Sequence, residues 1–189
     1  MGSLGKSSLL FLFLFFISFT ALAADLYVAT DGTNSGDCTD SESPCLTVQY
    51  AINQSSDNDT VHVGAGTFTE NISFNGKSIT IDGEGSSKTI LDGDASSHVV
   101  YIATTWTVEN VVISDLTIQN GRRTSGLGAG LTVLDSGEFD QATNVTLNRV
   151  TVKDNTNTSS SSEGAGVTYG GLGTLTINDS TIEGNTGAS

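Results

Sequence analysis

Basic residues are scarce in this chain of 189 amino acids, which has seven Lys and Arg against 21 Asp and Glu. So acidic a surface repels the phosphates of nucleic acid, and we expect no nucleic-acid partner. Histidine is limited to His62 and His98, which are too far apart to suggest a triad or a metal site, and no serine-nucleophile elbow is present. These shortages argue against enzymes that use a histidine-containing triad, a histidine-ligated metal or a serine-nucleophile elbow.

Long hydrophobic runs are also missing beyond the N-terminus. Residues 9–24 read LLFLFLFFISFTALAA after a single cation, Lys6, and Ala21-Leu22-Ala23 offers the small residues that a signal peptidase reads. The run is short for a membrane span, which needs about 20 apolar residues. We predict a cleaved signal peptide over residues 1–23 and a secreted or cell-surface protein, with an uncleaved signal anchor as the alternative. Membrane contact is then expected only through this segment or through a C-terminal region missing from the chain.

The two cysteines, Cys38 and Cys45, lie in the segment CTDSESPC. Exported proteins meet oxidising conditions, so we predict a small local disulfide. Cleavage after Ala23 removes Lys6 and leaves six basic against 21 acidic residues, a net charge of −15. Such acidity can gather Ca²⁺ loosely, but it does not identify a function. We predict no resident metal or cofactor, with Ca²⁺ as the one possibility.

A nine-residue phrase occurs three times, as ISDLTIQNG (113–121), LNRVTVKDN (147–155) and INDSTIEGN (177–185). In each copy apolar residues alternate with polar ones, which predicts short strands with one apolar face. Two residues separate the paired strands, and Asn or Asp there favours a sharp turn. A third strand precedes the later copies, in GAGLTV (128–133) and GAGVTY (164–169).

Three short strands that recur every 30 to 36 residues describe one circuit of a coil. Stacked circuits pair each strand with its counterpart one coil away, which predicts an all-β fold, a parallel β-helix (solenoid). The competing antiparallel sandwich would pair the strands on either side of each two-residue corner, and these are very short. We therefore expect Leu147 near Ile177 and Val152 near Ile182.

The start of a solenoid needs a cover over its open edge. Residues 46–52, LTVQYAI, place Leu46, Tyr50 and Ile52 near helical spacing after Pro44, which predicts a short capping helix. We assign residues 24–58 to an N-terminal strand, a disulfide loop and this helix, and residues 59–189 to the coils. Nothing in the sequence caps the last coil, so we expect either a longer parent protein or self-association.

The segments YVATDG, DCTDSESPCLTVQYAI and DTVHVGAGTFTENI resemble the N-terminal end of pectin-lyase-like, right-handed parallel β-helix proteins. GAGL or GAGV followed by VKDN or IEGN is similar to the Gly-Gly-Ala and Phe-x-x-Asn repeats of chlamydial polymorphic outer membrane proteins. Val152 and Ile182 replace the Phe of those repeats. The resemblance implies right-handed coiling and an asparagine ladder at the tight corner, formed by Asn148 and Asn178, from which Ser114 departs.

Enzymes of this superfamily use Ca²⁺-binding carboxylates with an Arg base, or clustered Asp residues. This chain has no Asp-Asp pair, Gly-His-Gly or Arg-x-Lys to match them, and we predict no catalytic residue. Arg122 and Arg123 are expected in a solvated loop, and Arg149 at a corner beside Asp side chains. Three aspartates, Asp82, Asp92 and Asp94, offer a possible Ca²⁺ site, although Asp-Gly is also ordinary turn chemistry, which we favour.

Six Asn-x-Ser/Thr sequons occur, and we expect Asn144 and Asn157, in loops between strands, to be the most accessible to glycosylation. The function that fits these observations is a non-catalytic binding or adhesive scaffold, with extracellular glycans or surface proteins as partners. The alternative is the N-terminal part of a polysaccharide lyase or glycoside hydrolase.

Overall fold

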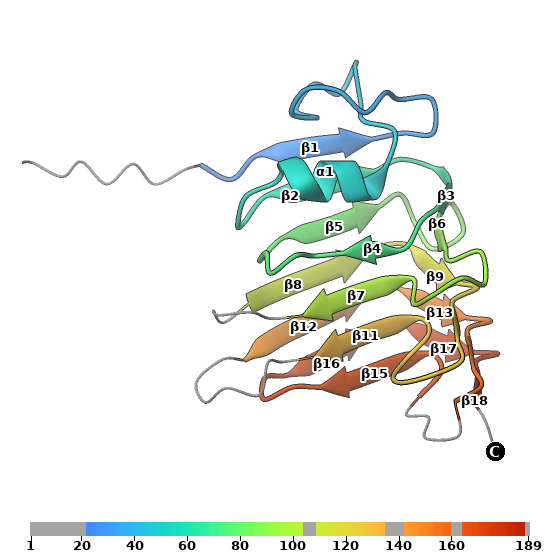
Figure 1. Ribbon diagram of the computed structural model, residues 1–189. Helices are drawn as coiled ribbons and strands as arrows, with labels where there is room; N and C mark the ends of the chain where they lie inside the picture. The colour runs from blue at the N-terminus through green and yellow to red at the C-terminus, as the bar shows by residue number, and fades with distance from the viewer. Residues whose placement is uncertain (1–21, 104–108, 135–141, 160–163, 188–189) are drawn as a thin grey trace, which may run out of the picture.

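The computed structural model describes residues 22–103, 109–134, 142–159 and 164–187, which wind into a parallel β-solenoid of about five turns (Figure 1). The predicted signal peptide lies almost wholly outside the described residues. The solenoid confirms the predicted fold class, with one short helix near the N-terminal end. All pairings between the described strands are parallel, so the antiparallel sandwich is excluded.

Sheet A runs the length of the solenoid and contains one strand from each coil after the N-terminal strand. Its strands, in spatial order, are β1 (Asp25–Val28), β2 (Thr60–Val63), β5 (Thr80–Gly83), β8 (Glu109–Ser114), β12 (Thr143–Asn148) and β16 (Leu175–Asn178). Ile113 pairs with Leu147, and Leu147 pairs with Ile177, as the repeated phrase predicts. The three copies of the repeated phrase therefore pair in register in successive coils.

Three further sheets contain strands from the coils, and sheets C and D each include only some of the coils. Sheet B contains β3 (Gly66–Thr69), β6 (Thr89–Asp92), β9 (Thr117–Gln119), β13 (Thr151–Lys153) and β17 (Thr181–Glu183). Sheet C contains β4 (Ile72–Ser73), β7 (Val100–Ala103), β11 (Leu131–Leu134) and β15 (Val167–Gly170). Sheet D contains β10 (Arg122–Arg123), β14 (Thr156–Asn157) and β18 (Thr186–Gly187). Val152 pairs with Ile182, which confirms the second predicted stacking.

The corner between sheets A and B has a left-handed residue in three successive coils. Asp115, Arg149 and Asp179 have φ angles of 57°, 55° and 48°. The next residues, Leu116 and Val150, are fully buried, so the chain bends while apolar side chains on both sides of the corner still point inward. Asp readily adopts this conformation, whereas Arg does so less often.

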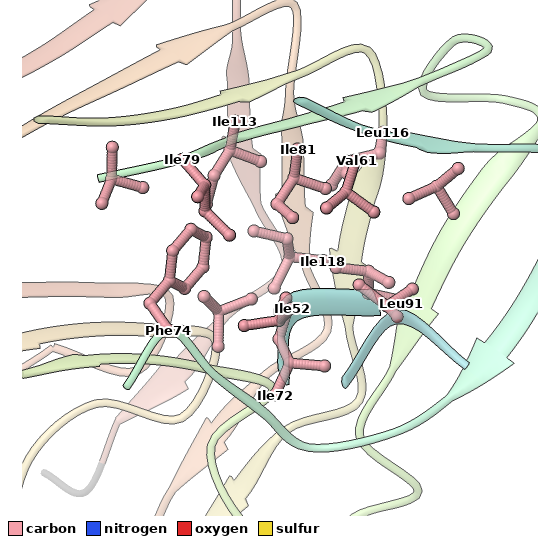
Figure 2. Packing of buried hydrophobic residues seen from close by; sticks show 14 of the residues in the cluster. Ile52, Val61, Ile72, Phe74, Ile79, Ile81, Leu91, Ile113, Leu116 and Ile118 are labelled. Carbon is pink, nitrogen blue, oxygen red and sulfur yellow. The ribbon is translucent and has the colours of Figure 1, made fainter. Parts of the chain in front are cut away.

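The core is a continuous stack of aliphatic side chains inside the coils (Figure 2). Val61, Ile81 and Ile113 follow one another along sheet A, and Leu91 and Ile118 face the same interior from sheet B. Each of these five side chains is at most 1% exposed. Burial of this kind stabilises by about 1.5 to 3 kcal/mol per side chain, so the stack is the main source of stability.

The helix α1 (Val48–Gln54) closes the N-terminal end of the interior by packing against β1, β2 and β4. Its buried side chains are Val48, Ala51 and Ile52, and Ile52 points into the core (Figure 2). The expectation that Leu46 is part of the helix face is wrong. The helix begins only after its N-cap, Thr47, so Leu46 still belongs to the extended chain before the helix. Leu46 is 40% exposed.

Side chains from the first coil hold both ends of α1. The Glu70 carboxylate accepts hydrogen bonds from the backbone N–H groups of Val48 and Gln49, each at 2.9 Å. The Lys77 ammonium donates to the carbonyls of Ile52 and Ser55 at 2.6 and 2.7 Å. The negative group at the N-terminus and the positive group at the C-terminus both match the helix dipole. Desolvation by partial burial lowers the pKa of Lys77, against the opposite influence of two nearby aspartates.

The predicted disulfide between Cys38 and Cys45 is present. The backbone of this loop is joined to β1, since Tyr27 N–H donates to Cys38 C=O and Cys45 N–H donates to Tyr27 C=O, both at 2.8 Å. The disulfide therefore closes a loop that lies along the first strand. None of the described residues form a helix long and apolar enough to cross a membrane.

Candidate functional site

An open groove of about 520 Å³ lies where three successive coils leave sheet B. Asp92 ends β6, Asn120 follows β9, Arg122 begins β10 and Asp154 follows β13. Left-handed φ angles of 48°, 56° and 55° at Asp94, Asn120 and Asp154 form the tight turns that bring these residues together. Asp and Asn tolerate this conformation, which is why DGD, QNG and KDN fold as turns here.

Asp92 is the most firmly held carboxylate of the groove. Its oxygens accept hydrogen bonds from the backbone N–H of Asp94 at 2.9 Å and from the side chains of Gln119 and Asn120 at 2.8 and 2.7 Å. Partial burial raises the pKa of Asp92, but the three hydrogen bonds outweigh it and lower the pKa below the ordinary 3.8. Asp92 therefore stays ionised near neutral pH and can accept hydrogen bonds, but it is not suited to act as a general acid.

The structure places Asp92 and Asp94, two of the three aspartates considered together in the sequence analysis, in one groove with Arg122, which lies in β10 and not in the loop that was expected. Arg122 is exposed on the groove, whereas the half-buried Arg123 approaches Ser97 with its Nη1 at 3.5 Å from the Oγ. Asp82 does not join this group, because it lies on sheet A. The groove thus presents hydrogen-bond donors and acceptors, and both negatively and positively charged side chains, to a polar ligand. Within the described ranges, no three His, Cys, Asp or Glu side chains gather closely enough to hold a metal ion.

A second open groove lies at the N-terminal end of sheet A, with Asp82 and His62 on its wall. His62 Nε2 is 2.9 Å from Asp25 Oδ1, and His62 Nδ1 is 3.7 Å from Asp82 Oδ2. The His62 ring also stacks on Tyr27, with 5.4 Å between the ring centroids. His62 therefore points outward from its strand, as the alternation of apolar residues around it predicts.

The predicted corner ladder forms on the outward side of sheet A. The Asn178 side-chain amide donates to the Asn148 side-chain oxygen at 2.9 Å, and Asn148 Nδ2 lies 3.4 Å from Ser114 Oγ. Ser114 thus continues the ladder with a hydroxyl instead of breaking it. Beside the ladder, Arg149 Nε donates to Asp115 Oδ1 at 2.7 Å, and this bond lowers the pKa of Asp115 and raises that of Arg149.

A second asparagine ladder, which the sequence analysis missed, lies inside the coils, where Asn155 is fully buried and Asn185 is half-buried. The amide of Asn155 donates to the side-chain oxygen of Asn185 at 2.9 Å, and the oxygen of Asn155 accepts the backbone N–H of Gly121 at 2.7 Å. A Cβ on Gly130 would lie 2.8 Å from Asn155 Nδ2, and one on Gly166 would lie 2.8 Å from Asn185 Nδ2. The Asn that ends two copies of the phrase, together with Gly-Ala-Gly in the same repeats, was the signal that could have revealed it.

The two sequons singled out as accessible lie in strands and not in loops. Asn157 is wrong as an accessible site, because it is fully buried in β14 and its amide donates to Gly126 C=O at 3.2 Å. A glycan on that nitrogen has no room in the folded coil. Asn144 is half-buried in β12, where its amide donates to the Asn110 side-chain oxygen at 3.1 Å. Glycosylation of Asn144 stays a prediction.

No protein-family model matches the chain, and no curated protein matches it significantly.

Proposed function

We propose that this protein is a secreted or cell-surface scaffold that binds extracellular glycans or surface proteins without catalysis. The observation that carries the proposal is the outward side of the parallel sheets, where short polar side chains repeat in register from coil to coil. On sheet A, Thr80 lies beside Thr60, and Thr146 lies beside Thr176 across the β12–β16 pair. Many weak contacts in a regular array suit adhesion to an extended partner.

The acidic balance of the chain supports the choice of partner. A net charge of −14 over the full sequence disfavours nucleic acid and other polyanions, while hydroxyl and amide groups bind neutral hydroxylated ligands. The Cys38–Cys45 disulfide is consistent with an oxidising extracellular setting, and the N-terminal hydrophobic run supplies the route there.

We also propose a relation to right-handed, pectin-lyase-like repeat proteins of the kind that includes the chlamydial polymorphic outer membrane proteins. The contacts of Gly130 with Asn155 and of Gly166 with Asn185 support this relation. They give a physical reason why a glycine-rich phrase and a terminal Asn occur in the same repeat: the Asn side chain, together with the Gly166 carbonyl in the case of Gly130, occupies the space that a Cβ would need.

The experiment is to present the purified secreted protein to a glycan array and to intact cell surfaces. We expect saturable binding without any change in the ligand. Absence of binding to every glycan and every cell type would contradict the scaffold function.

The alternative function, a polysaccharide lyase or glycoside hydrolase, is favoured by one observation: Asp92, Asp94 and Arg122 line a single groove. Pectate, alginate and neutral glycans should be incubated with the protein, with and without Ca²⁺, while unsaturated products and new reducing ends are followed. Turnover that Arg122→Ala abolishes and Arg123→Ala preserves would establish the enzyme instead, because the groove is lined by Arg122 and not by Arg123. We expect no turnover.

A further inference from the structure

Three neighbouring strands of sheet A, β8, β12 and β16, present a patch whose outward side chains, among those that the structure describes, are all uncharged. We call this patch the uncharged face. Its rows across the strands are Asn110, Asn144 and Thr174, which directly precedes β16, on one edge, Val112, Thr146 and Thr176 in the centre, and Asn148 and Asn178 beside the buried Ser114 on the other edge. Charged residues begin at its borders, with Asp82 on the preceding strand and the Asp115–Arg149 pair at the corner.

The alternation of the strands settles which way these side chains point. Val111, Ile113, Val145 and Leu147 are at most 1% exposed and fill the interior, so the residues between them point away from the core. Parallel pairing in register places equivalent side chains about 4.8 Å apart along the solenoid and about 6.6 Å apart along each strand. The uncharged face is therefore a regular grid.

The two edge rows are held by hydrogen bonds between coils. Asn144 donates to Asn110 at 3.1 Å and accepts from the Thr174 hydroxyl at 2.9 Å. On the opposite edge, Asn178 donates to Asn148 at 2.9 Å. Each amide nitrogen carries two hydrogens, so an Asn that donates one to the next coil keeps a second for a ligand. Because these side chains are already ordered, binding loses less conformational entropy.

The central row differs from its neighbours because Val112, Thr146 and Thr176 all carry a γ-methyl group. The profile across the strands is therefore polar, partly apolar and polar again. A pyranose ring has the complementary profile, with an apolar C–H face and a rim of hydroxyl groups. In an extended polysaccharide the length of one sugar unit is close to the distance between adjacent coils.

We infer that the uncharged face binds an extended, neutral polysaccharide that lies along the solenoid axis, with one sugar unit on each coil. The methyl groups of the central row contact the C–H face of each sugar, and the edge rows hydrogen-bond its hydroxyls. An anionic chain is disfavoured by the net charge of −14. This inference rests on the proposed scaffold function and names its surface and ligand class.

The test compares one substitution at two positions of the same coil. Thr146 lies on the uncharged face, and Thr151 points outward from β13 on sheet B. Binding of cellohexaose and chitohexaose is measured by titration calorimetry, with a galacturonate hexamer as the charged comparison. We expect Thr146→Lys to weaken binding about tenfold or more and Thr151→Lys to leave it within about twofold. Thr146→Val, which keeps the γ-methyl group and replaces the hydroxyl with a second one, should retain binding.

Thr176→Lys in the exposed last coil serves as the second face variant, so the test does not depend on one folded protein. Equal loss in Thr151→Lys, unchanged binding in both face variants, or preference for the galacturonate hexamer would overturn the inference. Glycan or cell-surface binding that survives both face variants leaves the scaffold function standing and places it on another surface. A protein that binds no glycan and no cell surface overturns both proposals.

Discussion

Asn155 shows how a polar side chain becomes part of the core. It is completely buried, yet its amide donates to Lys153 C=O and to Asn185, and its oxygen accepts the Gly121 N–H. These bonds join three successive coils at the point where the chain leaves sheet B. A buried amide is tolerated because its donors and acceptor are all used.

Replacing Asn155 by Ala should lower the free energy of unfolding by about 3 kcal/mol, because buried backbone groups of Gly121 and Lys153 lose their partner. Chemical denaturation measures the change. Asn148→Ala is the matched control, since Asn148 is in the outward ladder where water can replace the lost bond. It should cost less than about 1 kcal/mol. Equal costs at the two positions would mean that burial of the ladder is irrelevant to stability.

At the scale of the element, strand β12 has neighbours on both sides, β8 and β16, and its inward and outward residues have opposite roles. Leu147 is fully buried between Ile113 and Ile177, whereas Thr146, the preceding residue, faces outward. The strand is short, so its position depends on these cross-coil contacts more than on its own propensity.

Leu147→Asp should destabilise the protein by about 4 kcal/mol or more, since a carboxylate is then buried without a partner. Thr146→Asp places the same group one residue away on the outward side and should change stability by less than about 1 kcal/mol. The melting temperatures of the two variants measure this difference in stability. A Leu147→Asp protein that melts like the wild type would contradict the inward position of Leu147.

At the scale of the molecule, protection of the core changes along the solenoid. The N-terminal end is covered by α1, whereas apolar residues in the last described coil are partly open, with Ile177 at 41% and Ile182 at 48% exposure. The equivalent residues one coil earlier, Leu147 and Val152, are at most 1% exposed. Stability should therefore decline toward β16 and β17, which lie toward the end of the stack opposite α1 (Figure 1).

Amide hydrogen exchange should follow this gradient. In this chain of 189 residues we expect amides of β16 and β17 to exchange at least about tenfold faster than those of β8 and β9, because among the described strands β16 and β17 each have one neighbour, and Ile177 and Ile182 are partly exposed. Mass spectrometry of exchanged peptides resolves the difference. Uniform protection from β8 to β17 in a monomeric sample would contradict a stability gradient.

The stacking of strands from successive coils could be predicted from the sequence because the same apolar pattern occurs three times. The equal spacing of Leu147 and Ile177 within their phrases leaves one register in which both lie inward. The helix boundary was less accurate at Leu46, because the Thr47 cap and the Glu70 carboxylate decide where α1 begins. Glu70 is more than 20 residues away, and its role cannot be read from local spacing.

What the sequence determined by itself is the repeat: period-two alternation, sharp turns at Asp115 and Asp179, and a disulfide between the only two cysteines. What the tertiary structure alone decided is which polar residues meet. It buried Asn155 and Asn157, gathered Asp92 and Arg122 in one groove, and aligned Asn144 with Asn110 on the outward face. The reason is physical: alternation along one strand specifies inside and outside, whereas contacts between coils depend on loop lengths that bring distant residues into register.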